Sequence, residues 1–153
     1  MSEFELDPRI VGDSVALADL GSIHVRAMAH AAWPWLVLIP KHPGAVELYD
    51  LPEAVGNELQ IATLRLARAL KQAFAADKIN IAALGNVVSQ LHVHIVARQV
   101  GDPGWPSPVW GRNEAELSSE QAEERLLQLR NCLLPLDQID RSMPGLARNA
   151  SQA

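Results

Sequence analysis

The chain has 153 residues, of which 48% are hydrophobic, and a formal net charge of −5 at pH 7. This size suits one domain with its own core, and the acidic balance argues against broad electrostatic binding to nucleic acid or anionic lipid. The only cysteine, Cys132, excludes an internal disulfide, and no apolar run approaches the roughly 20 residues of a membrane span. The N-terminus lacks the features of a signal peptide, so we expect a cytoplasmic protein with no membrane or nucleic-acid partner.

The N-terminal part of the chain predicts an irregular segment followed by a hairpin. Residues 3–12 are expected to be irregular, because Pro8 breaks regular elements. Residues 14–18 and 22–28 have the composition of short strands, and Asp19-Leu20-Gly21-Ser22 between them favours a turn.

A continuous apolar run and a long amphipathic stretch follow. Residues 35–39 are entirely apolar, which predicts a central strand that is buried on both faces and that ends at Pro40. Asp50 and Glu53 have the spacing of a capping box, so a helix is predicted from Asp50 to near Asp77. Its apolar stripe comprises Val55, Leu59, Ala62, Leu66, Ala69 and Ala73.

The second half of the chain predicts two more strands, a loop and a final helix. Strands are expected over residues 78–84 and 90–100, separated by a loop over residues 85–89. Residues 101–111 contain three Pro and three Gly residues, which exclude regular structure, together with two Trp residues. We expect this Trp-containing loop to shape a pocket or a dimer contact.

A capping box at Ser118 predicts a C-terminal helix that ends near Pro135, and the tail over residues 141–153 is expected to be mobile. Together these elements predict one α+β domain over residues 1–153, with an antiparallel sheet of about five strands and two main helices packed on one face.

Polar side chains gather on one face of the predicted strand over residues 90–100. Alternation places Leu91, Val93, Ile95 and Ala97 toward the core. Gln90, His92 and His94 then share the opposite face, which indicates a functional site.

This pattern resembles the signature of the histidine triad (HIT) superfamily, in which three His residues alternate with apolar residues. His92 and His94 match the second and third His, and Gln90 stands where the first is usual. Gly85 and the strand from Trp35 to Lys41 also resemble the family pattern, and the resemblance covers roughly residues 10–112. It implies a HIT-like fold and a symmetric homodimer.

The resemblance also implies a reaction. In that family the middle His attacks the α-phosphorus of a nucleotide and forms a nucleotidyl-His intermediate, which water or another acceptor then resolves. Carried over by position, His92 is the nucleophile, and its other ring nitrogen must hold the proton and donate it, typically to a backbone carbonyl. His94 would bind a non-bridging phosphate oxygen, and Gln90 would orient a group or contact the leaving group.

Further substrate-binding residues are expected around this strand. Gly85 permits close approach of backbone amides to phosphate. Val87 departs from the Ser or Thr that is usual in the family, and Ser89 could compensate. The expected substrate-binding set is Asn80, Gly85, Asn86, Ser89 and His30.

Three functional readings remain open. The first is a nucleotide hydrolase or nucleotidyl transferase that acts on a purine nucleotide such as a dinucleoside polyphosphate or a nucleoside phosphoramidate, without a metal or other cofactor. The second is a nucleotide-binding module with little or no turnover, which Gln90 and Val87 favour. The third is a metal-dependent enzyme, because His-x-His on a strand can ligate zinc if further ligands are present.

Overall fold

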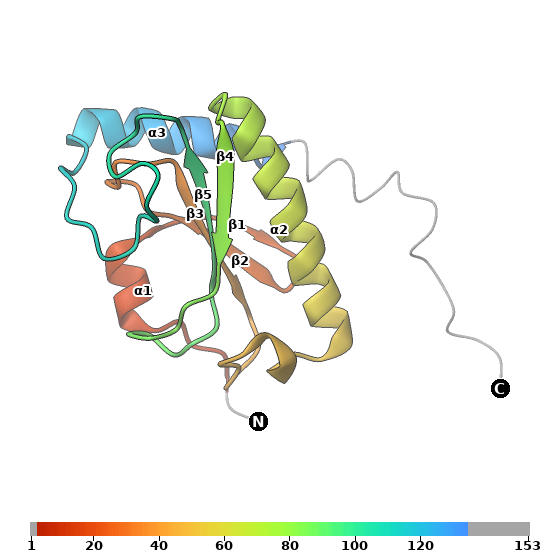
Figure 1. Ribbon diagram of the computed structural model, residues 1–153. Coiled ribbons are helices and arrows are strands. Elements are labelled where there is room, and N and C mark those ends of the chain that lie inside the picture. Colours follow the sequence, from red (N-terminus) through yellow and green to blue (C-terminus); the bar gives the residue numbers. More distant parts are fainter. Residues whose placement is uncertain (1–2, 135–153) are drawn as a thin grey trace, which may run out of the picture.

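The described part of the chain, residues 3–134 of a computed structural model, contains one five-stranded antiparallel sheet (Figure 1). The strand order across the sheet is β1-β2-β3-β5-β4. The bounds are Val15–Leu20 for β1, Ile23–Ala27 for β2, Trp35–Pro40 for β3, Lys78–Ala82 for β4 and Val93–Arg98 for β5. Two long helices, α2 (Glu53–Ala73) and α3 (Ser119–Asn131), complete the α+β fold that the sequence predicts.

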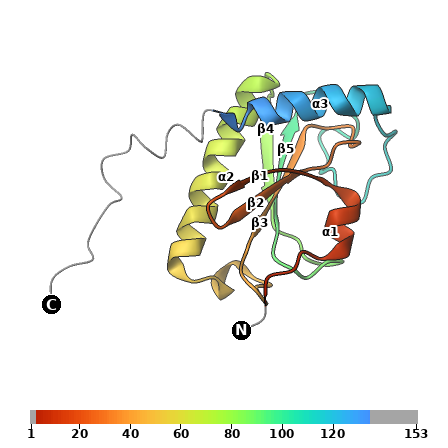
Figure 2. The ribbon, with the colours of Figure 1, turned by 180° about the vertical axis from the view of Figure 1, so that it is seen from behind.

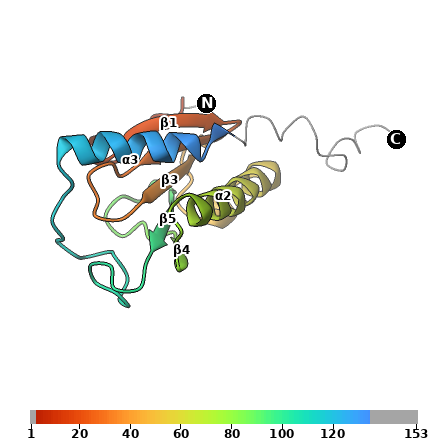
Figure 3. The same ribbon diagram turned by 90° about the horizontal axis from the view of Figure 1, so that it is seen from above.

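The sheet separates two cores, one on each face. On one face, here called the helix face, residues of β2, β3 and β5 pack against α2 and the C-terminal end of α3, through Leu36, Ile95, Leu66 and Leu129 among others. On the opposite face, here called the site face, Trp35, Val37, Ile39 and Val96 form a second core with Val109 from the loop after β5. Seen from above, α2 and that loop lie on opposite sides of the sheet (Figure 3).

Strand β3 is central, as its apolar sequence predicts. All six of its residues are buried, and it pairs with β2 on one side and with β5 on the other. The predicted hairpin is also present, with Leu20 of β1 paired to Ile23 of β2 and Gly21 in a left-handed conformation at φ +57°. A left-handed turn residue is favourable for glycine because it has no Cβ.

The prediction of an irregular segment over residues 3–12 is confirmed for residues 3–7 and wrong for residues 8–12. Residues Pro8–Asp13 form a short helix, α1, which lies on the other side of the molecule from α2 (Figure 2). Pro8 occupies the first helical position, where its missing N–H costs nothing and its fixed φ suits the helix. The Asp7 carboxylate caps this end by accepting a hydrogen bond from the backbone N–H of Arg9.

The predicted bounds of two elements also need correction. Helix α2 begins at Glu53, because Asp50 accepts hydrogen bonds from the N–H groups of Val46 and Glu47 and closes a separate 3₁₀ turn, η1 (Leu48–Asp50). It ends at Ala73 rather than near Asp77. Strand β5 begins at Val93 rather than Gln90, because the neighbouring strand β3 ends at Pro40, which has no N–H to offer the ladder.

Helix α3 has the predicted start, since Ser118 and Gln121 form a reciprocal capping box. Its predicted end at Pro135 and the predicted tail over residues 141–153 lie outside the described residues. Among residues 3–134, no helix combines the length and the hydrophobicity that a membrane crossing requires.

Candidate functional site

His92 and His94 lie next to each other on the site face of the sheet. Their ring centroids are 4.8 Å apart and their planes are nearly perpendicular, at 76°. His94 belongs to β5 and is buried, whereas His92 lies just before the strand and is partly exposed. The two imidazoles therefore form one site, with His92 the more accessible ring.

The hydrogen bond of His92 defines its tautomer. Its Nδ1 lies 2.7 Å from the backbone carbonyl oxygen of Gln90. A carbonyl oxygen can only accept, so Nδ1 carries the proton and donates it, which leaves the lone pair of the neutral ring on Nε2. This is the arrangement that a nucleophilic imidazole requires.

The hydrogen bond of His94 defines the opposite tautomer. The indole Nε1–H of Trp35 donates to Nδ1 of His94 at 3.0 Å, and an indole nitrogen can only donate. Nδ1 of His94 must then be unprotonated, and Nε2 of the neutral ring carries the hydrogen. Burial, with a smaller contribution from the charge of His92, lowers the pKa of His94 to about 4, so the ring is neutral at pH 7.

Aromatic rings surround His94. Trp35 and Trp110 each lie edge-on to its ring, with centroid distances of 5.5 and 5.6 Å, and Trp33 lies edge-on to Trp35 at 6.4 Å. Trp110 comes from the Trp-containing loop after β5, so this loop packs over the site face beside His94 instead of extending into solvent. The aromatic enclosure is the source of the burial that keeps His94 neutral.

The side-chain amide of Gln90 does not take the position expected for it, because both of its ends are bonded to the N-terminal segment. Its Oε1 accepts from the backbone N–H of Asp7 at 2.9 Å, and its Nε2 donates to the carbonyl oxygen of Glu5 at 2.8 Å. The amide thus holds the N-terminal segment. Gln90 does orient His92, but through its backbone carbonyl, which residues of any type possess.

The other predicted substrate-binding residues are distributed around the two rings. Gly85 adopts the left-handed conformation at φ +72°, and Asn86 and Ser89 are exposed in the loop that leads to His92. Asn80 pairs with Val96 and so lies on the site face, but its Oδ1 accepts a hydrogen bond from Arg98. Its Nδ2 hydrogens make no hydrogen bond within residues 3–134.

His30 lies on a separate cleft of about 750 Å³ on the site face. The cleft is also lined by Trp35 and Trp110, the two rings that contact His94, so these tryptophans lie between the cleft and the buried histidine. Nδ1 of His30 lies 3.2 Å from the carbonyl oxygen of Leu117, so this exposed ring is fixed at one nitrogen.

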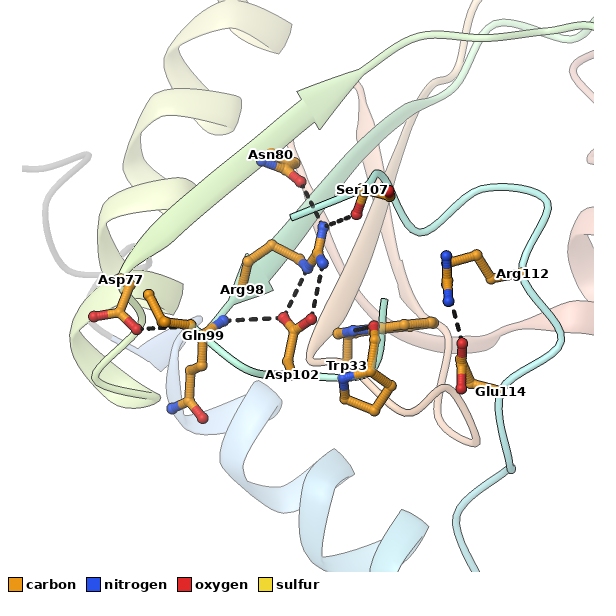
Figure 4. A network of polar contacts seen from close by, with 11 residues as sticks. Trp33, Asp77, Asn80, Arg98, Gln99, Asp102, Ser107, Arg112 and Glu114 are labelled. Atoms are coloured by element: carbon orange, nitrogen blue, oxygen red, sulfur yellow. Dashed lines mark hydrogen bonds and ion pairs between the residues drawn. The ribbon is translucent and has the colours of Figure 1, made fainter. Parts of the chain in front are cut away.

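Arg98 connects β5 to the Trp-containing loop (Figure 4). Its guanidinium makes two 2.8 Å hydrogen bonds to the Asp102 carboxylate, and Nη1 donates to Asn80 Oδ1 and to the carbonyl oxygen of Ser107. The guanidinium carbon also lies 5.6 Å from the ring centroid of Trp105. Because the Arg98 side chain is only 1% exposed, its charge depends on these partners.

Among residues 3–134, no three His, Cys, Asp or Glu side chains cluster closely enough to hold a metal ion. Nδ1 of His92 and Nδ1 of His94 are both already occupied by hydrogen bonds. If the His-x-His pair bound a metal ion, the described residues would supply at most two ligand atoms, Nε2 of His92 and Nε2 of His94.

Sequence reasoning missed two features of the site. The sequence predicts Trp35 in a core strand, but its hydrogen bond to His94 depends on the register between β3 and β5, which sequence spacing does not give. The sequence predicts Asp7 and Arg9 in an irregular segment, although Arg9 reaches the loop before His92 by donating to the carbonyl oxygen of Val87. A Pro preceded by Asp, the signature of a capped helix start, was the available signal.

The neutral state of His94 predicts a pH dependence of stability. The unfolded chain protonates this ring below its ordinary pKa of 6.5, whereas the folded chain does so only near pH 4. The unfolded state then binds more protons between these values, so stability decreases as the pH is lowered through this window, by at most about 3 kcal/mol. Urea unfolding at pH 7 and pH 4.5 should show a larger loss for the wild type than for His94→Leu; equal losses would contradict the buried, neutral assignment.

The Arg98–Asp102 pair predicts a large stability effect. Asp102→Asn leaves a buried guanidinium without its counter-charge and should lower the free energy of unfolding by about 3–5 kcal/mol. The matched control is Glu114→Gln, because the pair between Arg112 and Glu114 is about one-third exposed, at 36% and 29%. That variant should change stability by less than about 1 kcal/mol in the same chemical denaturation series. Similar effects for both variants would contradict the buried role of Arg98.

Comparisons with known proteins agree with this geometry. The family model described as "HIT domain" matches residues 11–101. A histidine triad protein from Sinorhizobium meliloti 1021 is 40% identical, with a TM-score of 0.79 over 85% of this chain and 97% of that one. One from Bradyrhizobium japonicum is also 40% identical, with a TM-score of 0.80 over 85% and 98%. One from Marinobacter aquaeolei VT8 is 35% identical, with a TM-score of 0.83 over 88% and 99%.

A comparison with curated proteins finds no match. The family model covers more than half of the chain, and the solved structures share both its fold and a substantial part of its sequence. The chain therefore belongs to the histidine triad (HIT) family, whose members generally bind nucleotides and are often nucleotide hydrolases or transferases.

Proposed function

We propose that this protein is a nucleotide hydrolase or nucleotidyl transferase that acts at the α-phosphate through a covalent nucleotidyl-His92 intermediate. One observation carries the proposal: the two rings hold opposite tautomers. His92 offers a lone pair on Nε2, and His94 offers an N–H on Nε2, so one ring can attack phosphorus while the other donates to a phosphate oxygen.

The reaction would proceed in two displacements. Nε2 of His92 forms a bond to the α-phosphorus as the bond from phosphorus to the leaving group breaks, and the leaving group departs with that electron pair. Water or another acceptor then forms a bond to phosphorus, the P–N bond to His92 breaks, and the ring is regenerated. His94 stabilises charge on the phosphate oxygens in both steps, and its low pKa keeps it a neutral donor.

The cleft beside His94 suits a nucleoside. Its volume of about 750 Å³ lies within the usual range for small-molecule sites, and Trp35 and Trp110 offer aromatic surface for a base. We assign the nucleoside to this cleft, with His30 at its edge, and the phosphate to Gly85, Asn86, Ser89 and Asn80. A purine nucleotide, present as a dinucleoside polyphosphate or a nucleoside phosphoramidate, fits this division.

The contacts of Gln90 bear on a second candidate function, a nucleotide-binding module with little turnover. We infer that Gln90 replaces the first His of the triad, and because its amide is held by Glu5 and Asp7, it neither transfers a proton nor contacts the leaving group. The orienting function passes to its backbone carbonyl. This observation, with the exposed Val87, favours the alternative of a nucleotide-binding module with little turnover, which the same assays would reveal.

We further propose that the chain acts as one domain in a cytoplasmic homodimer. Strand β4 lies at one edge of the sheet and exposes Ile81, which is 47% exposed, and Leu84, just beyond it, is 44% exposed. Leu64 of α2 is 59% exposed. Unpaired strand edges with apolar side chains associate readily, and a second copy of β4 is the partner of matching shape.

The dimer proposal predicts the mass of the protein in solution. Light scattering at micromolar concentration should give twice the chain mass, and Ile81→Asp should shift the protein toward the monomer, because it places a charge on the paired edge. Leu127→Asp on α3, where Leu127 is also exposed at 60%, serves as the matched control and should leave the mass unchanged. A monomer mass for the wild type would refute the proposal.

The nucleophile assignment predicts a sharp separation between two variants. His92→Gly should retain folding and nucleotide binding but lose turnover to background, because the attacking atom is gone, whereas His94→Ala should slow the reaction and leave it measurable. Intact-mass analysis after acid-free quenching should find a nucleotidyl adduct on the wild type and none on His92→Gly. An adduct that persists without His92, or unaffected turnover, would reject the mechanism.

A further inference from the structure

The N-terminal segment, residues 4–7, is hydrogen-bonded to Gln90, two residues before His92. The Gln90 amide makes two hydrogen bonds to the backbone of this segment, at Glu5 and Asp7, and the same residue accepts the His92 ring hydrogen through its own carbonyl. Phe4 and Leu6 add apolar contacts with the site-face core. Residues 4–7 and the nucleophile are therefore held by one residue, Gln90.

This fastening places Arg9 beside the loop that leads to the nucleophile. Arg9 Nη1 donates to the carbonyl oxygen of Val87 at 2.9 Å, between Gly85 and Ser89. Nε and Nη2 donate to the two carboxylate oxygens of Asp7 at 3.1 and 3.0 Å. A guanidinium has five N–H donors, so two remain, and the side chain is 56% exposed. Arg9 is thus fixed in direction and still able to bind an anion.

Two other basic side chains of the site face are buried and bonded within the fold. Arg98 is buried against Asp102, and Arg26 is buried with its guanidinium bonded to Ser14. Within residues 3–134, Arg9 is the basic side chain that hydrogen-bonds to the loop over residues 85–89. Asp7 lies close enough to His92 that the charge of His92 contributes, after the hydrogen bonds from Arg9, to lowering the pKa of the Asp7 carboxyl.

From this geometry we propose that Arg9 binds a second phosphate of the substrate, one beyond the phosphate that His92 attacks. The inference rests on the proposed function and narrows it. A leaving group that begins with a phosphate, as in a dinucleoside polyphosphate, gains a charge-assisted hydrogen bond from Arg9. A neutral amine leaving group, as in a nucleoside phosphoramidate, does not. Arg9 therefore selects polyphosphate substrates, and Gln90 is the residue that positions it.

Arg9 is already paired with the Asp7 carboxylate, so a second phosphate would have to displace Asp7 or share Arg9 with it. The Asp7 side chain is 21% exposed and the Arg9 side chain is 56% exposed. Because ion pairs that solvent reaches contribute little net free energy, replacing Asp7 by a phosphate as the partner of Arg9 costs little free energy. Removing either member of the pair should then have opposite effects. Loss of Arg9 weakens binding of the second phosphate, and neutralising Asp7 strengthens it. If the pair were purely structural, both changes would shift the affinity in the same direction.

The test compares nucleotides that differ only in the second phosphate. Affinities of AMP and of α,β-methylene-ADP, whose bridging carbon prevents cleavage, are measured by calorimetry for the wild type, Arg9→Ala, Arg9→Lys and Asp7→Asn. The wild type should prefer α,β-methylene-ADP by about tenfold or more, as expected for a hydrogen bond to a charged group. Arg9→Ala should bring the affinity ratio close to one, Arg9→Lys should restore part of it, and Asp7→Asn should increase it.

Two further variants complete the design. Arg68→Ala removes an equal charge from an exposed position on α2, on the opposite face, and should keep the wild-type ratio. Gln90→Leu removes the fastening of the N-terminal segment and should lower the ratio as Arg9→Ala does. An unchanged ratio in Arg9→Ala, or a reduced ratio in Asp7→Asn, would overturn the inference.

The outcome also separates this inference from the catalytic proposal. If the wild type forms no adduct and turns over no substrate, but its affinity ratio depends on Arg9 as described, then catalysis fails and the second-phosphate site stands. If turnover of a dinucleoside polyphosphate and of a phosphoramidate falls equally in Arg9→Ala, the catalytic proposal stands and the second-phosphate site fails. If neither nucleotide binds, both are rejected.

Discussion

The hydrogen bond from Trp35 to His94 is the interaction on which the site depends. It crosses from β3 to β5 and makes Nδ1 of His94 an acceptor, so that the N–H lies on Nε2. The adjacent ring of His92 has the reverse arrangement, because Gln90 offers a carbonyl oxygen to its Nδ1. Two chemically identical side chains, 4.8 Å apart, thus acquire different chemistry from their partners alone: one presents a lone pair and the other a hydrogen. Burial reinforces the difference, since it keeps His94 from taking up a proton that would repel a protonated neighbour.

The rest of the fold maintains this asymmetry. The helix-face core holds β3 and β5 in register, which sets where Trp35 meets His94. Arg98, at the end of β5, secures the Trp-containing loop through Asp102, and Trp110 of that loop encloses His94. On the other side of His92, the Gln90 amide holds the N-terminal segment. Gln90 therefore has two separable functions, because its backbone orients His92 and its side chain positions Asp7 and Arg9.

Much of the fold could be predicted from periodicity and turn chemistry. The apolar run of β3 and the capping box of Ser118 depend on residues close in sequence, and both are confirmed. The predicted stripe of α2 is confirmed at Leu59, Ala62 and Leu66, whereas Ala73 is exposed and Leu70 is buried instead. The pairing of His92 with His94 followed from strand alternation, although β5 begins only at Val93. Two wrong predictions concern local structure, namely the helix that begins at Pro8 and the 3₁₀ turn that Asp50 closes. The features of the site that the sequence does not reveal depend on contacts distant in sequence. The Gln90 side chain bonds to residues more than 80 positions away, and the Trp35–His94 bond spans 59 positions. No local pattern encodes such partners, so the tautomer of His94 and the bonds between Gln90 and the N-terminal segment required the structure.

The most direct test of the account is the protonation state of the four ring nitrogens. Long-range ¹H–¹⁵N correlation spectra of ¹⁵N-labelled protein at pH 7 distinguish protonated from bare imidazole nitrogens, and His92→Asn and His94→Leu assign the signals. We expect the proton on Nδ1 for His92 and on Nε2 for His94, with the His94 signals unchanged down to about pH 5, because its pKa is about 4. The same tautomer in both rings, or a doubly protonated His94 at pH 7, would contradict it.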